Sequence, residues 1–129
     1  MKSKIAIPLA SAAVAACAIF PGPAAAKSTG VVRVNGACTG ASTSKLKLSR
    51  EDGRIQVDFE VDQNRNGVRW GVAIADNGVR VFSGTARTAA PSGSFEVRRV
   101  IPDRAGPDHV VANARNLASG ERCRAAATI

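Results

Sequence analysis

The chain has 129 residues, with 18 Lys+Arg against 10 Asp+Glu and a formal net charge of +8. This length provides one domain with one core and excludes a multidomain enzyme. The hydrophobic fraction of 45% and the charged fraction of 22% are those of a globular protein rather than a disordered or collagen-like chain. A single histidine argues against chemistry that needs several of them.

Residues 1–26 have the pattern of a secretory signal peptide, with a basic start, an apolar middle and a small-residue end. Two lysines supply the charge, residues 5–20 are apolar and uncharged, and residues 24–26 are all Ala. The apolar run of about 16 residues is slightly short for a membrane span. We therefore expect removal of this segment, a secreted domain of residues 27–129 and no transmembrane segment.

Cys17 leaves an alternative open. Residues 14–17, Val-Ala-Ala-Cys, resemble the lipobox of bacterial lipoproteins, whose cysteine is lipidated. That alternative would anchor the domain by lipid to the outer face of the cytoplasmic membrane. The Pro- and Ala-rich ending of the segment favours the simpler interpretation, in which Cys17 is a small apolar residue of the signal peptide.

Two cysteines remain in the predicted domain, Cys38 near its start and Cys123 near its end. In an oxidising compartment an even pair of this kind predicts a disulfide. Free thiols or a metal-binding pair are the alternative, but no further Cys or suitable His is present to complete a metal site. We expect a disulfide and no bound metal.

Alternating apolar and polar residues predict strands through almost the whole domain. In chain order, strands are expected at 31–34, 45–50, 55–62, 68–74, 79–82, 95–100, 109–114 and 122–128. The dipeptide Asn77-Gly78 predicts a tight hairpin between two of them. About eight short strands in about 100 residues predict an all-β antiparallel sandwich, with Trp70 between its sheets.

Residues 108–116 resemble the penultimate strand of immunoglobulin-like domains, which often contains Tyr-x-Cys-x-Ala-x-Asn. Val110 stands at the Tyr position and Ala112 at the Cys position, while Ala114 and Asn116 match the remainder. The resemblance implies an immunoglobulin-like β-sandwich. Because the usual cysteine is missing, its inter-sheet disulfide cannot form, and the two terminal cysteines must join the terminal strands instead.

The spacing of Cys38, Trp70, the segment 92–97 and Cys123 is similar to that in a group of small actinobacterial secreted proteins of unknown function. The similarity covers nearly the whole predicted domain. It implies the fold and the compartment, and it implies no activity and no cofactor.

The candidate catalytic groups do not assemble into a site. His109 follows Asp108, but adjacent strand residues point to opposite faces, so neither can easily orient the other. Asp58, Glu60 and Asp62 share one strand face, as a glycosidase carboxylate pair could. A solvated face neutralised by neighbouring arginines is the commoner arrangement. We expect no enzyme.

Residues 62–67 match the first half of a calcium-binding loop, with oxygen side chains at alternate positions and Gly at the sixth. The position for the bidentate carboxylate is Ala73, which offers no ligand, and Arg65 lies inside the loop. We therefore expect a polar hairpin loop here, without metal.

The positive charge suggests a nucleic acid or an anionic envelope polymer as partner. The arginines are dispersed along the sequence among acidic residues, however, and at least three of the four aromatics of the domain fall on predicted core faces. These aromatics are Phe59, Trp70, Phe82 and Phe95. Without a stacking platform we expect no nucleic-acid binding, and an anionic envelope polymer stays open as a partner.

A two-residue Asn77-Gly78 loop would pair Ala73 with Phe82 and turn Phe82 to the outer face. Aromatic and Arg side chains dominate interface hot spots, so the sequence predicts an interaction patch there. The patch comprises Phe82, Arg80, Arg69 and Ala73. A covering loop, or a bulge that returns Phe82 to the core, is the alternative.

The leading interpretation is a secreted, non-enzymatic binding module whose partner is a protein or an anionic envelope polymer. The alternative is a small secreted inhibitor of an extracellular enzyme, with residues 88–94, which include Pro91, as its reactive loop. An edge strand could also pair with another copy of the chain. The sequence contains no sign for or against such an oligomer.

Overall fold

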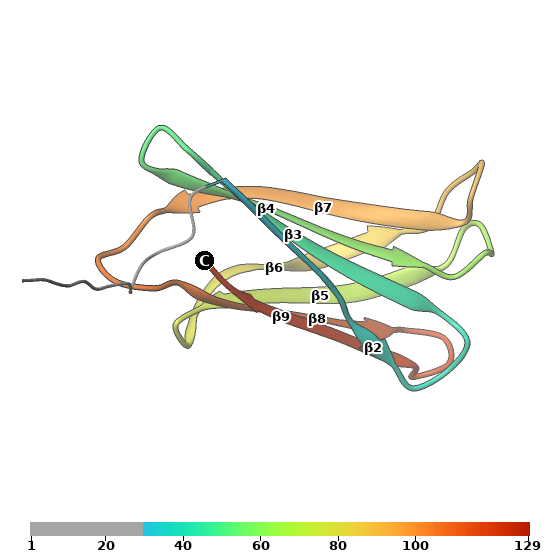
Figure 1. Cartoon of the computed structure of the whole chain (residues 1–129). Coiled ribbons are helices and arrows are strands. Elements are labelled where there is room, and N and C mark those ends of the chain that lie inside the picture. The colour runs from blue at the N-terminus through green and yellow to red at the C-terminus, as the bar shows by residue number, and fades with distance from the viewer. Residues whose placement is uncertain (1–29) are drawn as a thin grey trace, which may run out of the picture.

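The computed structural model describes residues 30–129, which form two antiparallel sheets packed face to face (Figure 1). The four-stranded sheet has the order β1-β3-β4-β7, and the five-stranded sheet has the order β2-β9-β8-β5-β6. The strands are β1 (Val31–Asn35), β2 (Ala37–Cys38), β3 (Thr43–Glu51), β4 (Arg54–Asp62), β5 (Arg69–Asp76), β6 (Val79–Arg87), β7 (Ser94–Pro102), β8 (His109–Asn116) and β9 (Arg122–Thr128). The predicted all-β sandwich is confirmed.

The predicted signal peptide and Cys17 lie outside the described residues. Within residues 30–129 there is no helix with the length and apolar character needed to cross a bilayer.

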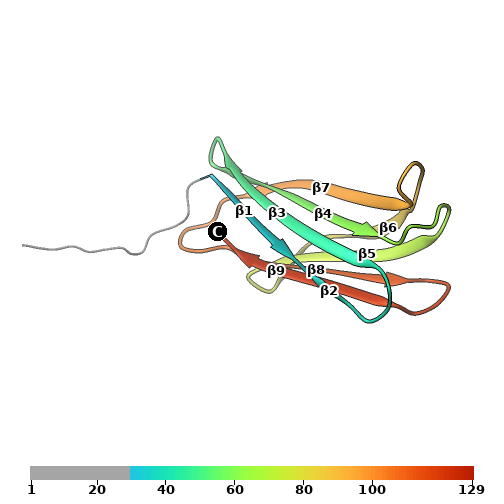
Figure 2. The same ribbon diagram turned by 45° about the vertical axis from the view of Figure 1, so that its right-hand side comes forward.

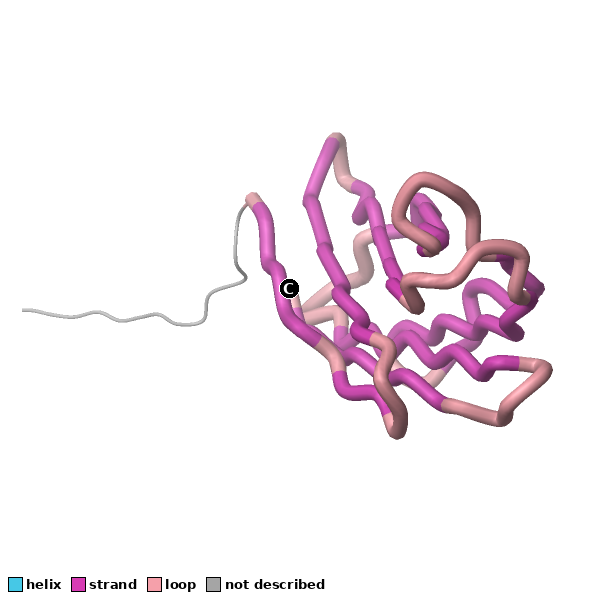
Figure 3. The backbone as a smooth tube through the Cα atoms, turned by 90° about the vertical axis from the view of Figure 1, so that its right-hand side faces the viewer, coloured by secondary structure: helices cyan, strands magenta, loops and turns pink. Residues whose placement is uncertain are grey.

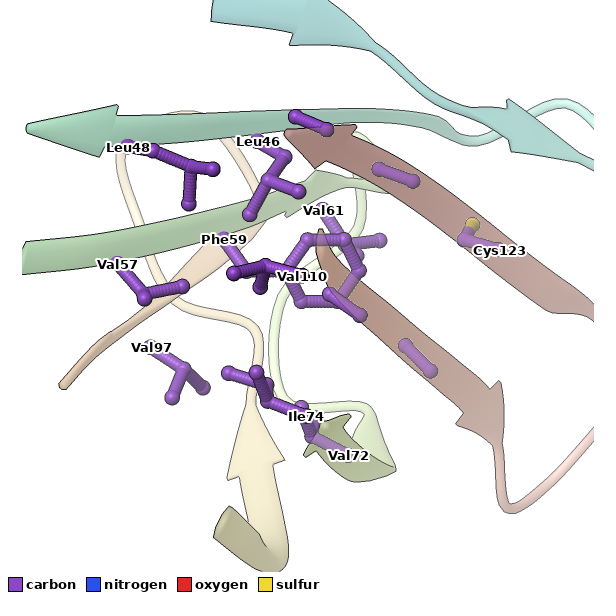
Figure 4. Packing of buried hydrophobic residues seen from close by; sticks show 14 of the residues in the cluster. Leu46, Leu48, Val57, Phe59, Val61, Val72, Ile74, Val97, Val110 and Cys123 are labelled. Atoms are coloured by element: carbon purple, nitrogen blue, oxygen red, sulfur yellow. The ribbon is translucent and has the colours of Figure 1, made fainter. Parts of the chain in front are cut away.

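The core lies between the sheets, where the apolar residue of each alternating pair points inward (Figure 4). On β4, Val57 and Phe59 are fully buried, as the alternation predicts. Trp70 on β5 is also fully buried, its ring centroid lies 6.0 Å from that of Phe95, and its Nε1 donates a hydrogen bond of 3.0 Å to Gln63 Oε1. A buried indole N–H therefore has its partner.

The predicted disulfide is confirmed: Cys38 on β2 is bonded to Cys123 on β9. The chain reaches this position by crossing between the sheets, because β1 pairs with β3 whereas β2 pairs with β9 (Figure 2). Gly36 lies at the crossing, where a Cβ atom would be 2.3 Å from Ser44 Oγ. Only glycine fits this approach without a shift of its neighbours.

The two ends of the sandwich differ in their connections. The β3–β4 and β5–β6 turns, the β7–β8 loop and the C-terminus lie at one end (Figure 1). The β2–β3, β4–β5, β6–β7 and β8–β9 loops lie at the other end, which faces the viewer in Figure 3.

Candidate functional site

The predicted register of the β5–β6 hairpin is wrong beyond its first pairs. Asp76 pairs with Val79 as expected, but a β-bulge between Ile74 and Ala75 then places Phe82 opposite Ile74 instead of Ala73. A shift of one residue moves every following side chain to the other face of the sheet. Phe82 therefore lies on the inner face.

Phe82 closes the edge of the sandwich between β6 and β7. It is half-buried and packs against the core. The guanidinium carbon of Arg99 lies 4.4 Å from the centroid of its ring, a cation–π geometry. Arg99 pairs with the inward residue Val57 on β4, so its side chain starts from the inner face of the four-stranded sheet.

We expect Phe82→Ala to lower the free energy of unfolding by about 2 kcal/mol, the lower end of the range for truncated core residues, because the ring is half-buried. Urea unfolding measures this loss. Val79→Ala on the same strand is the control: Val79 is 49% exposed, and its loss should stay near 0.5 kcal/mol. Equal losses for the two variants would place Phe82 outside the core.

The other three residues of the predicted patch, Arg80, Arg69 and Ala73, lie on the outer face of the five-stranded sheet, opposite to Phe82. They belong to a larger surface. Six exposed arginines project from this face, and we call it the arginine face: Arg69, Arg80, Arg87, Arg115, Arg122 and Arg124.

Within residues 30–129 the arginine face carries no acidic side chain. Four of the 10 acidic residues lie on the outer face of the four-stranded sheet: Asp58, Glu60, Asp62 and Glu96. Asp76 and Asp108 are fully buried, and the others lie at turns and loops. Glu121 precedes Arg122 but points away from the face, because its carboxylate accepts hydrogen bonds from the N–H and the hydroxyl of Ser42.

Four of these arginines form directly opposed cross-strand pairs. Arg115 on β8 pairs with Arg122 on β9, and Arg69 on β5 pairs with Arg87 on β6. Like charges directly opposite each other destabilise a sheet. No carboxylate of the described chain forms an ion pair with any of the four, so no opposite charge there offsets the repulsion. Arg87 Nε donates a hydrogen bond of 3.4 Å to the neutral Gly67 carbonyl.

Two shallow hollows lie beside these pairs. The larger, of about 500 Å³, has a floor of small residues that includes Gly71 and Ala73, and it is lined by Arg115 and Arg122. The second, of about 330 Å³, is lined by the other opposed pair, Arg69 and Arg87. Leu117 lines both hollows and is 50% exposed, so it forms an apolar ridge between them.

The outer face of the four-stranded sheet is different, because its charges neutralise each other. Asp58 accepts hydrogen bonds from Arg98 and from Gln56, and Lys45 lies 3.5 Å from Glu60. The row of carboxylates that suggested acid–base chemistry is thus the neutralised face expected from the sequence. Its mixed charge gives no preference for an anion or a cation.

The remaining sequence candidates lie apart from the arginine face or are used structurally. Asp108 points inward and is fully buried, whereas His109 is exposed and its Nδ1 lies 2.8 Å from Thr128 Oγ1. In the calcium-like loop, Asp62 Oδ1 accepts a hydrogen bond from the Asn64 N–H, and Asn64 has a left-handed φ of 58°. That loop is an internally bonded turn, as expected.

Residues 88–94, the predicted inhibitor loop, form a compact turn. Ala89 and Ser94 pair as an isolated bridge, and the Gly93 N–H donates to the Ala89 carbonyl. The Gly93 carbonyl in turn accepts from the Gln63 N–H, which ties this turn to the β4–β5 loop. Only its tip projects, and the inhibitor function stays an untested prediction.

A pair of acidic residues is buried at the other end of the sandwich. Asp76 and Asp108 are fully buried, and within residues 30–129 no N–H or hydroxyl group donates a hydrogen bond to their carboxylate oxygens. Burial, together with hydrogen bonding to and repulsion from the adjacent Asp108 carboxyl, raises the pKa of Asp76 to about 6. Arg104, whose Nε lies 3.6 Å from Asp76 Oδ2, opposes the rise.

Sequence reasoning missed the arginine face because its members are scattered from residue 69 to residue 124 on four strands. A signal was present. On these strands arginines occupy positions that alternate with core residues, as Arg69 does beside Trp70 and Arg122 beside Cys123. On the four-stranded sheet, by contrast, acidic residues occupy many of the outward positions that alternate with core residues.

Neither a scan against protein-family models nor a search of curated proteins finds a match to this chain. The actinobacterial group named from the sequence is therefore a prediction without support from relatives. The functional assignment rests on the residues described above.

Proposed function

We propose that the protein is a secreted, non-enzymatic binding module that holds an anionic polymer on its arginine face. One observation carries the proposal: six arginines share a sheet face that bears no carboxylate, and two cross-strand pairs among them oppose like charges. Folding gains nothing from such pairs. An anion bound between two guanidinium groups turns the repulsion into attraction through charge-assisted hydrogen bonds.

The chemistry of the face favours an anionic polymer over a protein or nucleic-acid partner. The aromatic side chains of the described chain, Phe59, Trp70, Phe82 and Phe95, all belong to the core or pack against it. Bases and protein hot spots both rely on exposed aromatics. The arginine face offers charge, small residues and a single exposed leucine, which suits a slender, flexible anion.

The immunoglobulin-like type and the extracellular location belong to the same proposal. Trp70 lies on β5, which pairs with β8, and β8 pairs with β9, as strands C, F and G do in immunoglobulin-like sandwiches. The β3–β4 hairpin within one sheet departs from that pattern. The disulfide is compatible with an oxidising, extracellular compartment.

The test is binding of the purified, disulfide-bonded protein to cell-envelope polyanions at about 0.05 and 0.3 M salt, where charge-driven binding should weaken steeply. We expect Arg115→Gln/Arg122→Gln to weaken binding about tenfold, or about 1.4 kcal/mol.

The matched control is Lys45→Gln/Lys47→Gln, which removes the same charge from the outer face of the four-stranded sheet. This variant should bind within about twofold of the wild type, since its lysines lie on the neutralised face. Equal weakening by both variants would reduce the binding to general charge attraction and overturn the proposal.

A further inference from the structure

The two hollows of the arginine face divide its charge into two separate sites. One opposed pair, Arg115 and Arg122, lines the larger hollow, and the other, Arg69 and Arg87, lines the smaller one. Leu117 stands between them, and one of its methyl carbons would lie 3.6 Å from a Cβ added at Gly71. A ligand that reaches both hollows must therefore pass over an apolar side chain.

The sheet register fixes the spacing between the inner arginines of the two sites, Arg115 and Arg69. Directly opposed residues have Cβ atoms about 5 Å apart, and diagonal neighbours lie about 7–8 Å apart. Gly71 pairs with Arg115, so Arg69, two residues away on the same strand, is diagonal to Arg115. The four arginines thus form a line across β9, β8, β5 and β6 with a diagonal step in its middle.

We infer that the arginine face binds a linear phosphodiester chain whose phosphates are separated by short polyol linkers. One phosphate binds at Arg115 and the next at Arg69, and the carbon linker between them crosses Leu117. Arg122 and Arg87 flank the two phosphates on their outer sides. This inference rests on the proposed function and names its ligand class. The guanidinium fork matches the non-bridging oxygens of a phosphate.

The length of such a linker agrees with the diagonal step. A glycerol phosphate unit places six backbone bonds between successive phosphorus atoms. An extended peptide covers about 3.3–3.6 Å with three bonds, so six bonds cover about 7 Å. Inorganic polyphosphate, with two bonds per repeat, would place a charged group over Leu117, where desolvation is costly.

The polymers with other linkers fit less well. Carboxylated polysaccharides carry a sugar ring between charges, and sugar rings and bases bind on aromatic side chains. The exposed part of the arginine face provides none, because the four aromatics of the described chain lie in or against the core. The floor of the larger hollow includes Gly71, Ala73 and Ser83, which offer no ring on which a sugar could stack.

The test is calorimetric titration of the disulfide-bonded protein with three probes of equal charge number: oligo(glycerol phosphate), inorganic polyphosphate and oligogalacturonate, at about 0.15 M salt. We expect oligo(glycerol phosphate) to bind at least about tenfold more tightly than either other probe. Arg69→Gln/Arg87→Gln and Arg115→Gln/Arg122→Gln should each remove this advantage, and Lys45→Gln/Lys47→Gln should keep it. Urea midpoints at or above that of the wild type will show that the arginine variants fold, because each of them removes an opposed pair of like charges.

Leu117→Gln tests the ridge separately, since it keeps the size of the side chain and removes its apolar character. This substitution should reduce the ratio of the affinities for oligo(glycerol phosphate) and polyphosphate to about threefold or less. Equal binding of the three probes by the wild type would overturn the inference and leave the proposed function standing. Binding of none of them, and none to envelope polyanions, would overturn both.

Discussion

Replacing both Cys38 and Cys123 by alanine is expected to lower the free energy of unfolding by about 4 kcal/mol. The bridge spans 85 residues, and in the chain-entropy account a closed loop of this length restricts the unfolded chain by about 4–5 kcal/mol. Cys123 is buried, and alanine fits its place in the core. A domain of this size has a total stability of about 5–15 kcal/mol, so much of it would be lost.

Without the bridge, local opening should begin at β2, the edge strand of the five-stranded sheet. β2 has only two residues, and nearby backbone support comes from the Thr39 N–H to the Arg122 carbonyl and from the Gly36 N–H to the Ser44 carbonyl. Urea unfolding of the variant and of the reduced wild type should give the same midpoint, which is the control for side-chain packing. A loss below about 1 kcal/mol would show that the bridge adds little to an already closed sandwich.

Asp76→Asn is expected to raise stability at pH 8 by roughly 3 kcal/mol. The pKa of Asp76 rises from 3.8 to about 6 on folding, and one pKa unit corresponds to about 1.4 kcal/mol. The folded state therefore holds the proton more tightly than the unfolded state. The stabilisation from this proton is complete below pH 3.8, falls as the pH rises to 6 and is lost above it.

Burial is the largest cause of the raised pKa of Asp76, and its charged neighbours modify that rise. Asp108 and Asp103 carry negative charge and disfavour its ionised form, whereas Arg104 favours it. Asparagine stays neutral at every pH, and its amide can donate a hydrogen bond to the buried Asp108 carboxylate. The free energy of unfolding of the variant should therefore lack the change with pH that Asp76 causes between pH 4 and 6 in the wild type.

The measurement is urea unfolding of wild type and variant at pH 4.5, 6 and 8. The difference between them should grow with pH in favour of the variant. Glu51→Gln at the exposed β3–β4 turn is the control, with an expected change within about 0.5 kcal/mol. A variant that is less stable than the wild type at pH 8 would show that ionised Asp76 is stabilised by Arg104.

Much of the fold could be predicted from local pattern. Alternation on segments such as 55–62 places residues on two faces of a strand without any knowledge of the partner strand. Asn77-Gly78 marked its hairpin correctly, since both residues have positive φ, of 50° and 84°. The disulfide could be predicted because only two cysteines were left to pair.

The prediction from sequence becomes wrong where one extra residue shifts the pairing of β5 with β6. The bulge between Ile74 and Ala75 has no distinctive sequence mark, because Arg80-Val81-Phe82 alternates acceptably in either register. Packing decides it: opposite Ile74, the Phe82 ring can contact the core and the Arg99 guanidinium. That benefit depends on β7, which is distant in sequence and belongs to the other sheet.

The strands, their buried faces, the Asn77-Gly78 turn and the cysteine pair could be read from the sequence, because they follow from side-chain period and turn chemistry within short segments. Which strands are neighbours became clear from the three-dimensional fold alone. It brought Arg69, Arg87, Arg115 and Arg122 into one line and left the acidic residues on the other sheet, in the interior or at turns and loops. The physical reason is that charge acts through space, so a surface of one sign exists only once strands distant in sequence lie about 5 Å apart.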